Sequence, residues 1–125
     1  MKILDLSHLL NNRTPVYPGT EKPVFMKANS IEKNGFAETL ISMYSHTGTH
    51  MDAPGHMIAG AKLLDEFDIS TFYGPAVCID CTRILNETIS LSNLLPFVDL
   101  IKQVDFVLLK TLWSEKWLDN EYFGA

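Results

Sequence analysis

The chain has 125 residues, of which 46% are hydrophobic, 20% charged and 10% aromatic, and its net charge is -5. This composition is typical of one globular domain and excludes a disordered tail or a small disulfide-dependent scaffold. An acidic chain without a basic run also lacks the footprint of a nucleic-acid binder and is disfavoured at anionic membranes. We therefore expect a single domain over residues 1–125.

In the N-terminal sequence MKILDLSHLL, Asp5 follows an apolar run that is too short for the hydrophobic core of a signal peptide. No uncharged apolar stretch approaches the roughly 18 residues that span a bilayer. The two cysteines, Cys78 and Cys81, cannot build a disulfide framework and would remain thiols in a reducing compartment. We expect a cytoplasmic protein that makes no contact with membranes.

The predicted elements are strands and one good helix. Residue pattern and flanking Gly or Pro predict strands at residues 2–7, 24–29, 36–45, 75–82 and 104–110. The pair Asn34-Gly35 predicts a turn that joins two of these strands as a hairpin. One or two helical turns are expected at 63–67, and a helix capped by Ser90 or Ser92 is expected to run to about Gln103. The order of these strands and helices along the chain predicts an α/β or α+β fold.

The segment SHTGTHMDAPGH, residues 45–56, holds three of the four histidines. His46, His50, Asp52 and His56 are separated by even numbers, which places them on one face of an extended chain; in a helix Asp52 would lie about 240° from His46. An extended chain would still hold the Cα atoms of His46 and His50 about 13 Å apart, so a shared ion requires a bend. Gly48, midway between them, can provide it.

Two imidazoles and one carboxylate form a ligand set that suits Zn²⁺ or Mn²⁺ and leaves a position for water. Such an ion lowers the pKa of bound water toward neutrality and makes it a nucleophile. His56, displaced from the row by Pro54 and Gly55, is the candidate for proton transfer. The alternative is a polar loop in which these side chains only cap and hydrogen-bond the backbone. His8 is expected to be a surface or hydrogen-bonded residue and not a ligand.

The stretch from His46 to His56 closely resembles the HxGTHxDAPxH signature of the cyclase-like metal hydrolases, a family that includes bacterial kynurenine formamidase and isatin hydrolase. Agreement extends to DLS at 5–7, PVYPG at 15–19, GPAV at 74–77, and KT at 110–111 followed by Trp113. The resemblance implies that His46, His50 and Asp52 bind metal, that Asp52 bridges two ions, that His56 is the catalytic acid/base and that Tyr17 binds substrate. It also implies a swivelling β/β/α domain around a mixed sheet, assembled as a homodimer or homotetramer.

The chain departs from the family pattern in length and at one residue. Family members are usually longer, and their second metal site takes a histidine and a glutamate from the C-terminal half, whereas no histidine follows His56 here. We therefore expect that the C-terminal portion of the fold is missing, through truncation, fragmentation or completion by another polypeptide. Leu112 stands where the family commonly has glycine before Trp113.

The resulting hypothesis is a metal-dependent hydrolase that cleaves a carbon–nitrogen amide bond of a small aromatic substrate such as N-formylkynurenine, with metal-bound hydroxide as nucleophile. The alternative is a truncated, inactive remnant of the same family that binds metal weakly or acts as an interaction module. Phosphate-cradling, dinucleotide-binding and serine-hydrolase motifs are absent from the sequence, so those classes have no support.

Overall fold

The computed structural model describes residues 2–84, 88–119 and 121–124. The chain divides into two compact units: an N-terminal unit of Met1–Asp52 with Lys116–Ala125, and a central unit of Ala53–Glu115. The two units contain one small sheet each. The single domain over residues 1–125 stays a prediction.

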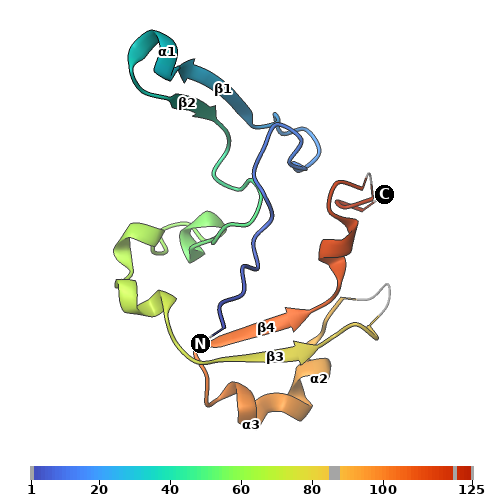
Figure 1. Cartoon of the computed structure of the whole chain (residues 1–125). Coiled ribbons are helices and arrows are strands. Elements are labelled where there is room, and N and C mark those ends of the chain that lie inside the picture. The colour runs from blue at the N-terminus through green and yellow to red at the C-terminus, as the bar shows by residue number, and fades with distance from the viewer. Residues whose placement is uncertain (1, 85–87, 120, 125) are drawn as a thin grey trace. The chain divides into compact units, whose positions relative to one another are not determined.

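The sheet of the N-terminal unit is an antiparallel hairpin of β1 (Val24–Asn29) and β2 (Glu38–Ser42) (Figure 1). The one-turn helix α1 (Ile31–Asn34) joins the strands and ends at Gly35, whose φ of +79° lies in the left-handed region that glycine adopts readily. The predicted hairpin is confirmed, although β2 is shorter than the predicted strand at 36–45.

The predicted strand at residues 2–7 is wrong, because these residues are irregular. A strand needs a neighbouring strand for its backbone groups, and no strand pairs with residues 2–7 in the part of the chain that the structure describes. The Asp5 carboxylate accepts hydrogen bonds from the Ser7 hydroxyl at 2.6 Å and from the Ser7 N–H at 2.8 Å. Both bonds hold the pKa of Asp5 below its usual value, and the bond from the Ser7 hydroxyl has the larger effect.

The sheet of the central unit pairs β3 (Ala76–Asp80) with β4 (Phe106–Lys110) in parallel, with Val77 opposite Val107. The predicted strands at 75–82 and 104–110 are confirmed with shorter bounds. Parallel strands need a long crossover connection, and here it carries α2 (Leu91–Leu94) and α3 (Val98–Ile101), which Figure 1 shows on one side of the sheet.

The predicted continuous helix from Ser90 or Ser92 to Gln103 is wrong in one respect, since a 3-10 helix, Leu95–Phe97, separates α2 from α3. Pro96 lies inside this segment and has no N–H to donate to the preceding turn, so the α-helical ladder is interrupted there. The predicted start is observed at Ser90, whose N–H and hydroxyl both donate to Asn93 Oδ1, at 2.8 and 2.7 Å.

The remaining helical segments are short 3-10 helices, each a single turn or little more. They are Pro54–His56, Leu64–Glu66, Ile69–Phe72 and Trp113–Lys116. The helical turn predicted at 63–67 is confirmed by the second of these. No helix among the described residues is long and apolar enough to cross a membrane.

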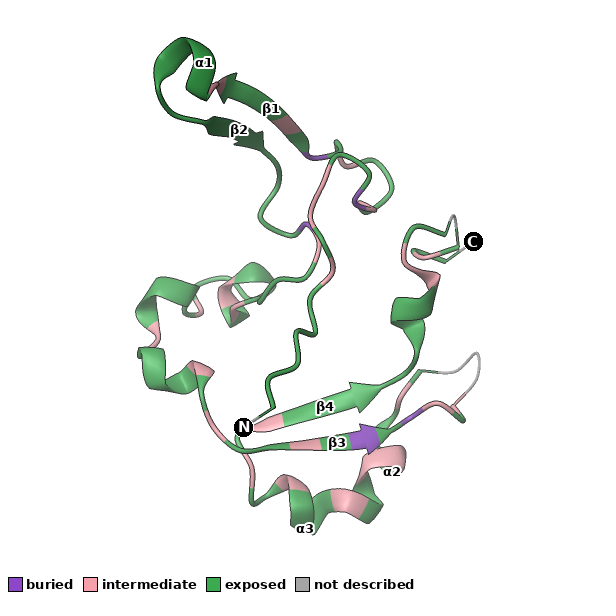
Figure 2. Cartoon of the chain, in the orientation of Figure 1, coloured by how far each residue is buried: buried purple, intermediate pink, exposed green. Residues whose placement is uncertain are grey.

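Burial is sparse in both units (Figure 2). The buried residues of the described part are Thr14, Pro23, Thr47, Ile79 and Cys81. Parallel sheets are normally covered on both faces, yet the side chains from Val107 to Leu109 in β4 remain 38–43% exposed. β4 therefore presents partly exposed apolar side chains on the central sheet.

These elements confirm an α/β fold. The expected mixture of parallel and antiparallel strands is present, but it is divided between two separate two-stranded sheets in the described residues. Each orientation follows its connection: a short helical turn returns the chain as a hairpin, and a long helical crossover brings it back in parallel.

Leu112 provides a test of backbone strain. Its φ is +61°, a conformation that costs a non-glycine residue about 1–2 kcal/mol. We predict that Leu112→Gly raises the free energy of unfolding by about 0.5–1 kcal/mol, because relief of strain exceeds the added flexibility of glycine in the unfolded chain. Urea denaturation measures the difference. The control Leu109→Gly, in the extended backbone of β4, should destabilise, and a loss of stability in Leu112→Gly would contradict the assignment of strain.

Candidate metal centre

The segment that follows β2 has no regular structure and bends at glycine. Residues 46–52, called the metal loop below, form a turn and bend over 46–49 and are irregular over 50–52. Gly48 has a φ of +70°, so the predicted bend between His46 and His50 is observed. Thr47 is buried, with 2% of its surface exposed.

The bend brings the side chains of His46, His50 and Asp52 together. His46 Nδ1 lies 2.6 Å from Asp52 Oδ1, and His50 Nε2 lies 3.3 Å from the same oxygen. One ligand atom from each residue lies within 4.8 Å of the others. The three side chains are 40%, 31% and 48% exposed, in the order of the sequence, so that an ion could reach them from solvent.

The distances within this triad fit a small divalent ion. Tetrahedral bonds of about 2.0–2.1 Å would place ligand atoms about 3.3 Å from one another. The separation of His50 Nε2 and Asp52 Oδ1, 3.3 Å, already has that value, and the 2.6 Å between His46 Nδ1 and Asp52 Oδ1 would have to lengthen by less than about 1 Å. Two imidazoles and a carboxylate thus form a cradle that a metal ion could occupy.

The second ring nitrogen of His50 orients the imidazole. His50 Nδ1 lies 2.8 Å from the backbone oxygen of Gly48. A carbonyl oxygen can only accept, so Nδ1 carries the proton in this hydrogen bond. The bond directs Nε2 toward Asp52, where the neutral imidazole would offer a lone pair to a metal ion.

The N-terminal segment supports the metal loop from one side. The backbone N–H of His8 donates to Thr49 Oγ1 at 3.1 Å. The Leu10 side chain lies against Gly48, where a Cβ would approach Leu10 Cδ2 to 3.1 Å. Gly48 is therefore favoured by its left-handed backbone, and a Cβ at this position would have to displace the Leu10 side chain by a few tenths of an ångström.

His56 ends the 3-10 helix Pro54–His56 in the central unit and is exposed. The turn is tight, since the Gly55 N–H donates to the Lys62 backbone oxygen at 2.9 Å and a Cβ at Gly55 would lie 2.7 Å from Leu63 Cδ2. The triad belongs to the N-terminal unit, so the catalytic role of His56 stays a prediction.

Tyr17 lies in the loop before β1 and is 69% exposed. Its ring contacts Phe123 edge to face, with centroids 6.0 Å apart and an interplanar angle of 81°. This contact leaves most of the phenol ring accessible to a ligand. The substrate-binding role of Tyr17 stays a prediction.

The pattern of the sequence did not reveal the partner of His8. Its imidazole stacks on the Trp117 indole, with centroids 4.2 Å apart and an interplanar angle of 4°. His8 is not part of the metal-ligand group found among the described residues, and its expected role outside the ligand set stays a prediction. No local spacing could have indicated a contact between residues so far apart in the chain.

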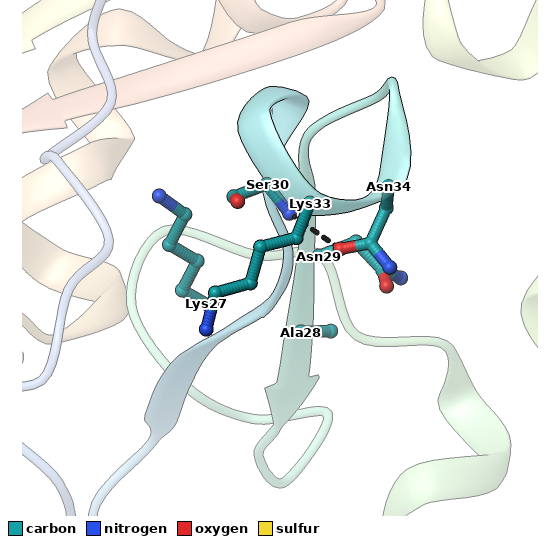
Figure 3. A pocket seen from close by; sticks show the side chains of 6 residues that line it. All are labelled: Lys27, Ala28, Asn29, Ser30, Lys33 and Asn34. Carbon is teal, nitrogen blue, oxygen red and sulfur yellow. Dashed lines mark hydrogen bonds between the residues drawn. The ribbon is translucent and has the colours of Figure 1, made fainter.

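Figure 3 shows a different hollow, at the tip of the hairpin. It is lined by Lys27, Ala28, Asn29, Ser30, Lys33 and Asn34. The Ser30 N–H donates to Asn34 Oδ1 at 3.1 Å, and the lysines are exposed. This hollow carries no histidine or carboxylate, so the triad remains the candidate site.

Comparison with known proteins agrees with the motif. A family model described as a putative cyclase matches residues 4–125. The kynurenine formamidase of Bacillus cereus is 32% identical over 109 residues, which are 86% of this chain and 50% of that protein. Cyclase-like protein 1 of Oryza sativa subsp. japonica is 30% identical over 124 residues, 94% of this chain and 44% of that protein.

A solved structure shares the fold. An isatin hydrolase bound to the product analogue thioisatinate superposes with a TM-score of 0.74 at 24% identity, over 96% of this chain and 53% of that chain. The chain therefore spans about half the length of the relatives it matches.

Gly48 and Gly19 together test the bend. Both have left-handed backbones, but only Gly48 faces a side chain, since nothing lies within 4 Å of a Cβ at Gly19. We predict that Gly48→Ala lowers the free energy of unfolding by about 1–2 kcal/mol and Gly19→Ala by about 1 kcal/mol. Chemical denaturation measures both. Adding Leu10→Ala should reduce the difference between the two losses of the free energy of unfolding. Equal losses in Gly48→Ala and Gly19→Ala would contradict crowding at Gly48.

Proposed function

The chain belongs to the putative cyclase family, and on that premise we propose that it acts as a metal-dependent hydrolase that cleaves a carbon–nitrogen amide bond of a small aromatic molecule. The observation that carries the proposal is the convergence of His46, His50 and Asp52 on one exposed point of the metal loop. These are three of the four residues in the motif His46–His56 whose side chains can bind a metal ion, and the fourth is His56.

We propose that the ligands are His46 Nδ1, His50 Nε2 and Asp52 Oδ1, and that the ion is Zn²⁺, with Mn²⁺ as the second choice. A divalent ion at this point supplies a water of lowered pKa and a Lewis acid for the substrate carbonyl. The chain's own part is to hold the three donors in place, through the Gly48 bend and the hydrogen bond from His50 Nδ1 to the Gly48 oxygen.

The names of the relatives support an aromatic amide as substrate. Kynurenine formamidase and isatin hydrolase are both named for aromatic compounds, and we propose N-formylkynurenine as the best candidate. The exposed ring of Tyr17 offers a surface on which an aromatic substrate could stack.

The reaction adds water across the amide bond. The carbonyl carbon gains a bond to the water oxygen, the carbon–nitrogen bond breaks, and the departing nitrogen takes a proton and leaves as an amine. We assign the transfer of that proton to His56, because an imidazole can both donate and accept a proton. Its exposure on a tight turn leaves the imidazole accessible to a substrate.

We further propose that the protein works in the cytoplasm as a homo-oligomer. Cys78 is an exposed thiol, which suits a reducing compartment. Oligomerisation is supported by the apolar side chains that the hairpin exposes, among them Met26, Leu40 and Ile41 at 52–53%, because an isolated two-stranded hairpin is only marginally stable in water.

Metal binding can be measured apart from activity. We predict that the dialysed chain binds one Zn²⁺ in isothermal titration, and that Asp52→Ala weakens binding at least about 100-fold because it removes the oxygen nearest both histidines. His56→Ala, the control, should bind Zn²⁺ as the unmodified chain does. Equal affinity in Asp52→Ala would contradict the assignment of the triad.

Hydrolysis tests the catalytic role. With Zn²⁺ bound, we predict release of formate from N-formylkynurenine, and a rate about 10²–10⁴-fold lower in His56→Ala because the leaving nitrogen loses its proton donor. Metal content of the two proteins should be equal. Equal rates would remove His56 from the mechanism, and tight metal binding without any hydrolysis would favour an inactive remnant.

A further inference from the structure

A stacked pair of rings joins the first residues of the N-terminal unit to its C-terminal segment. The rings of His8 and Trp117 are nearly parallel, at 4°, with centroids 4.2 Å apart, and both residues are half-buried. Parallel aromatic rings at this distance have a fixed mutual orientation and contribute about 0.5–1.5 kcal/mol beyond the area they bury. Trp117 thus restrains the position of His8.

The backbone of His8 connects this restraint to the metal loop. Its N–H donates to Thr49 Oγ1, and Thr49 lies directly between Gly48 and the ligand His50. Two residues further along, Leu10 fills the space beside Gly48. The segment that Trp117 restrains therefore contacts the metal loop at the bend itself.

The backbone next to Trp117 is held in a conformation of high energy. Leu118 has a φ of +73°, which costs a leucine about 1–2 kcal/mol. The turn around it is closed by a hydrogen bond from the Asp119 N–H to the Lys116 oxygen at 2.8 Å and by the ion pair of Lys116 with Glu121 at 3.4 Å.

Trp117 is also fixed from its other side by aromatic rings. Tyr122 contacts Trp117 edge to face, with centroids 5.1 Å apart, and Phe123 contacts Tyr122 in the same way at 5.0 Å. The indole is thereby held between Tyr122 and His8. Strain at Leu118 together with these ring contacts indicates that the position of Trp117 is strongly determined.

We propose that Trp117 is a positioning residue for the metal centre: by stacking on His8 it holds the bend of the metal loop and so sets the affinity of the triad for its ion. The effect on metal affinity rests on the proposed metal centre, whereas the restraint of His8 by Trp117 is a property of the metal-free chain. Trp117 acts through its contact with His8 and the hydrogen bond from the His8 N–H to Thr49.

The first experiment measures Zn²⁺ affinity by competition with a chromophoric chelator in three variants. Trp117→Leu removes the stack and should weaken binding about tenfold or more, the range found when groups that orient metal ligands are lost. Trp117→Phe keeps an aromatic ring and should stay within about threefold of the unmodified chain. Trp113→Leu is the matched control, the same substitution at a tryptophan of the central unit, and should leave the affinity unchanged.

The second experiment measures amide hydrogen exchange in the metal-free chain. The His8 amide, which donates to Thr49, should exchange about tenfold faster in Trp117→Leu, while the amides of β1 and β2 keep their protection and so report an intact hairpin. Faster exchange confined to His8 and the metal loop is the signature of a lost local restraint and not of general unfolding.

The outcomes separate this inference from the proposed function. Unchanged His8 exchange in Trp117→Leu overturns the positioning role whatever the metal data show. Equal Zn²⁺ affinity in Trp117→Leu and the unmodified chain also overturns it. Faster exchange in a chain that binds no Zn²⁺ in any variant supports the restraint and refutes the proposed metal centre.

Discussion

The left-handed bend at Gly48 is the constraint on which the candidate site depends. Residues with the spacing of His46, His50 and Asp52 share a face only in an extended chain, yet an extended chain holds the two histidines too far apart for one ion. At a φ of +70° the chain turns back, and the Gly48 oxygen becomes the acceptor for His50 Nδ1. One backbone angle thus brings the donors together and supplies the hydrogen-bond acceptor that orients the His50 ring.

The bend is maintained by contacts from distant parts of the chain. Leu10 packs beside Gly48, the His8 N–H donates to Thr49, and Trp117 stacks on His8. An exposed loop with three polar side chains buries too little apolar surface to hold one conformation by itself. Its order comes from the segment packed against it, which is why the residues from Lys116 onward belong to the same compact unit as the metal loop.

The apolar side chains of both sheets are partly exposed. Each has two strands, and the parallel pair of β3 and β4 exposes apolar side chains although such sheets are normally enclosed. Membership of the putative cyclase family accounts for the element order, while the chain spans about half the length of the relatives it matches. The unpaired strand edges and open faces are surfaces on which additional polypeptide, from another copy or another chain, would find backbone and apolar partners.

Local pattern by itself determined the hairpin, the strands β1, β3 and β4, the bend at Gly48 and the set of three converging residues, because alternation, turn residues and ligand spacing are properties of short segments. Tertiary structure decided the rest. Residues 2–7 lack a partner strand, Pro96 divides the helix, and the His8–Trp117 stack joins residues that no spacing relates. Such contacts depend on where distant segments pack, and that packing is set by the fold as a whole and not by the residues on either side.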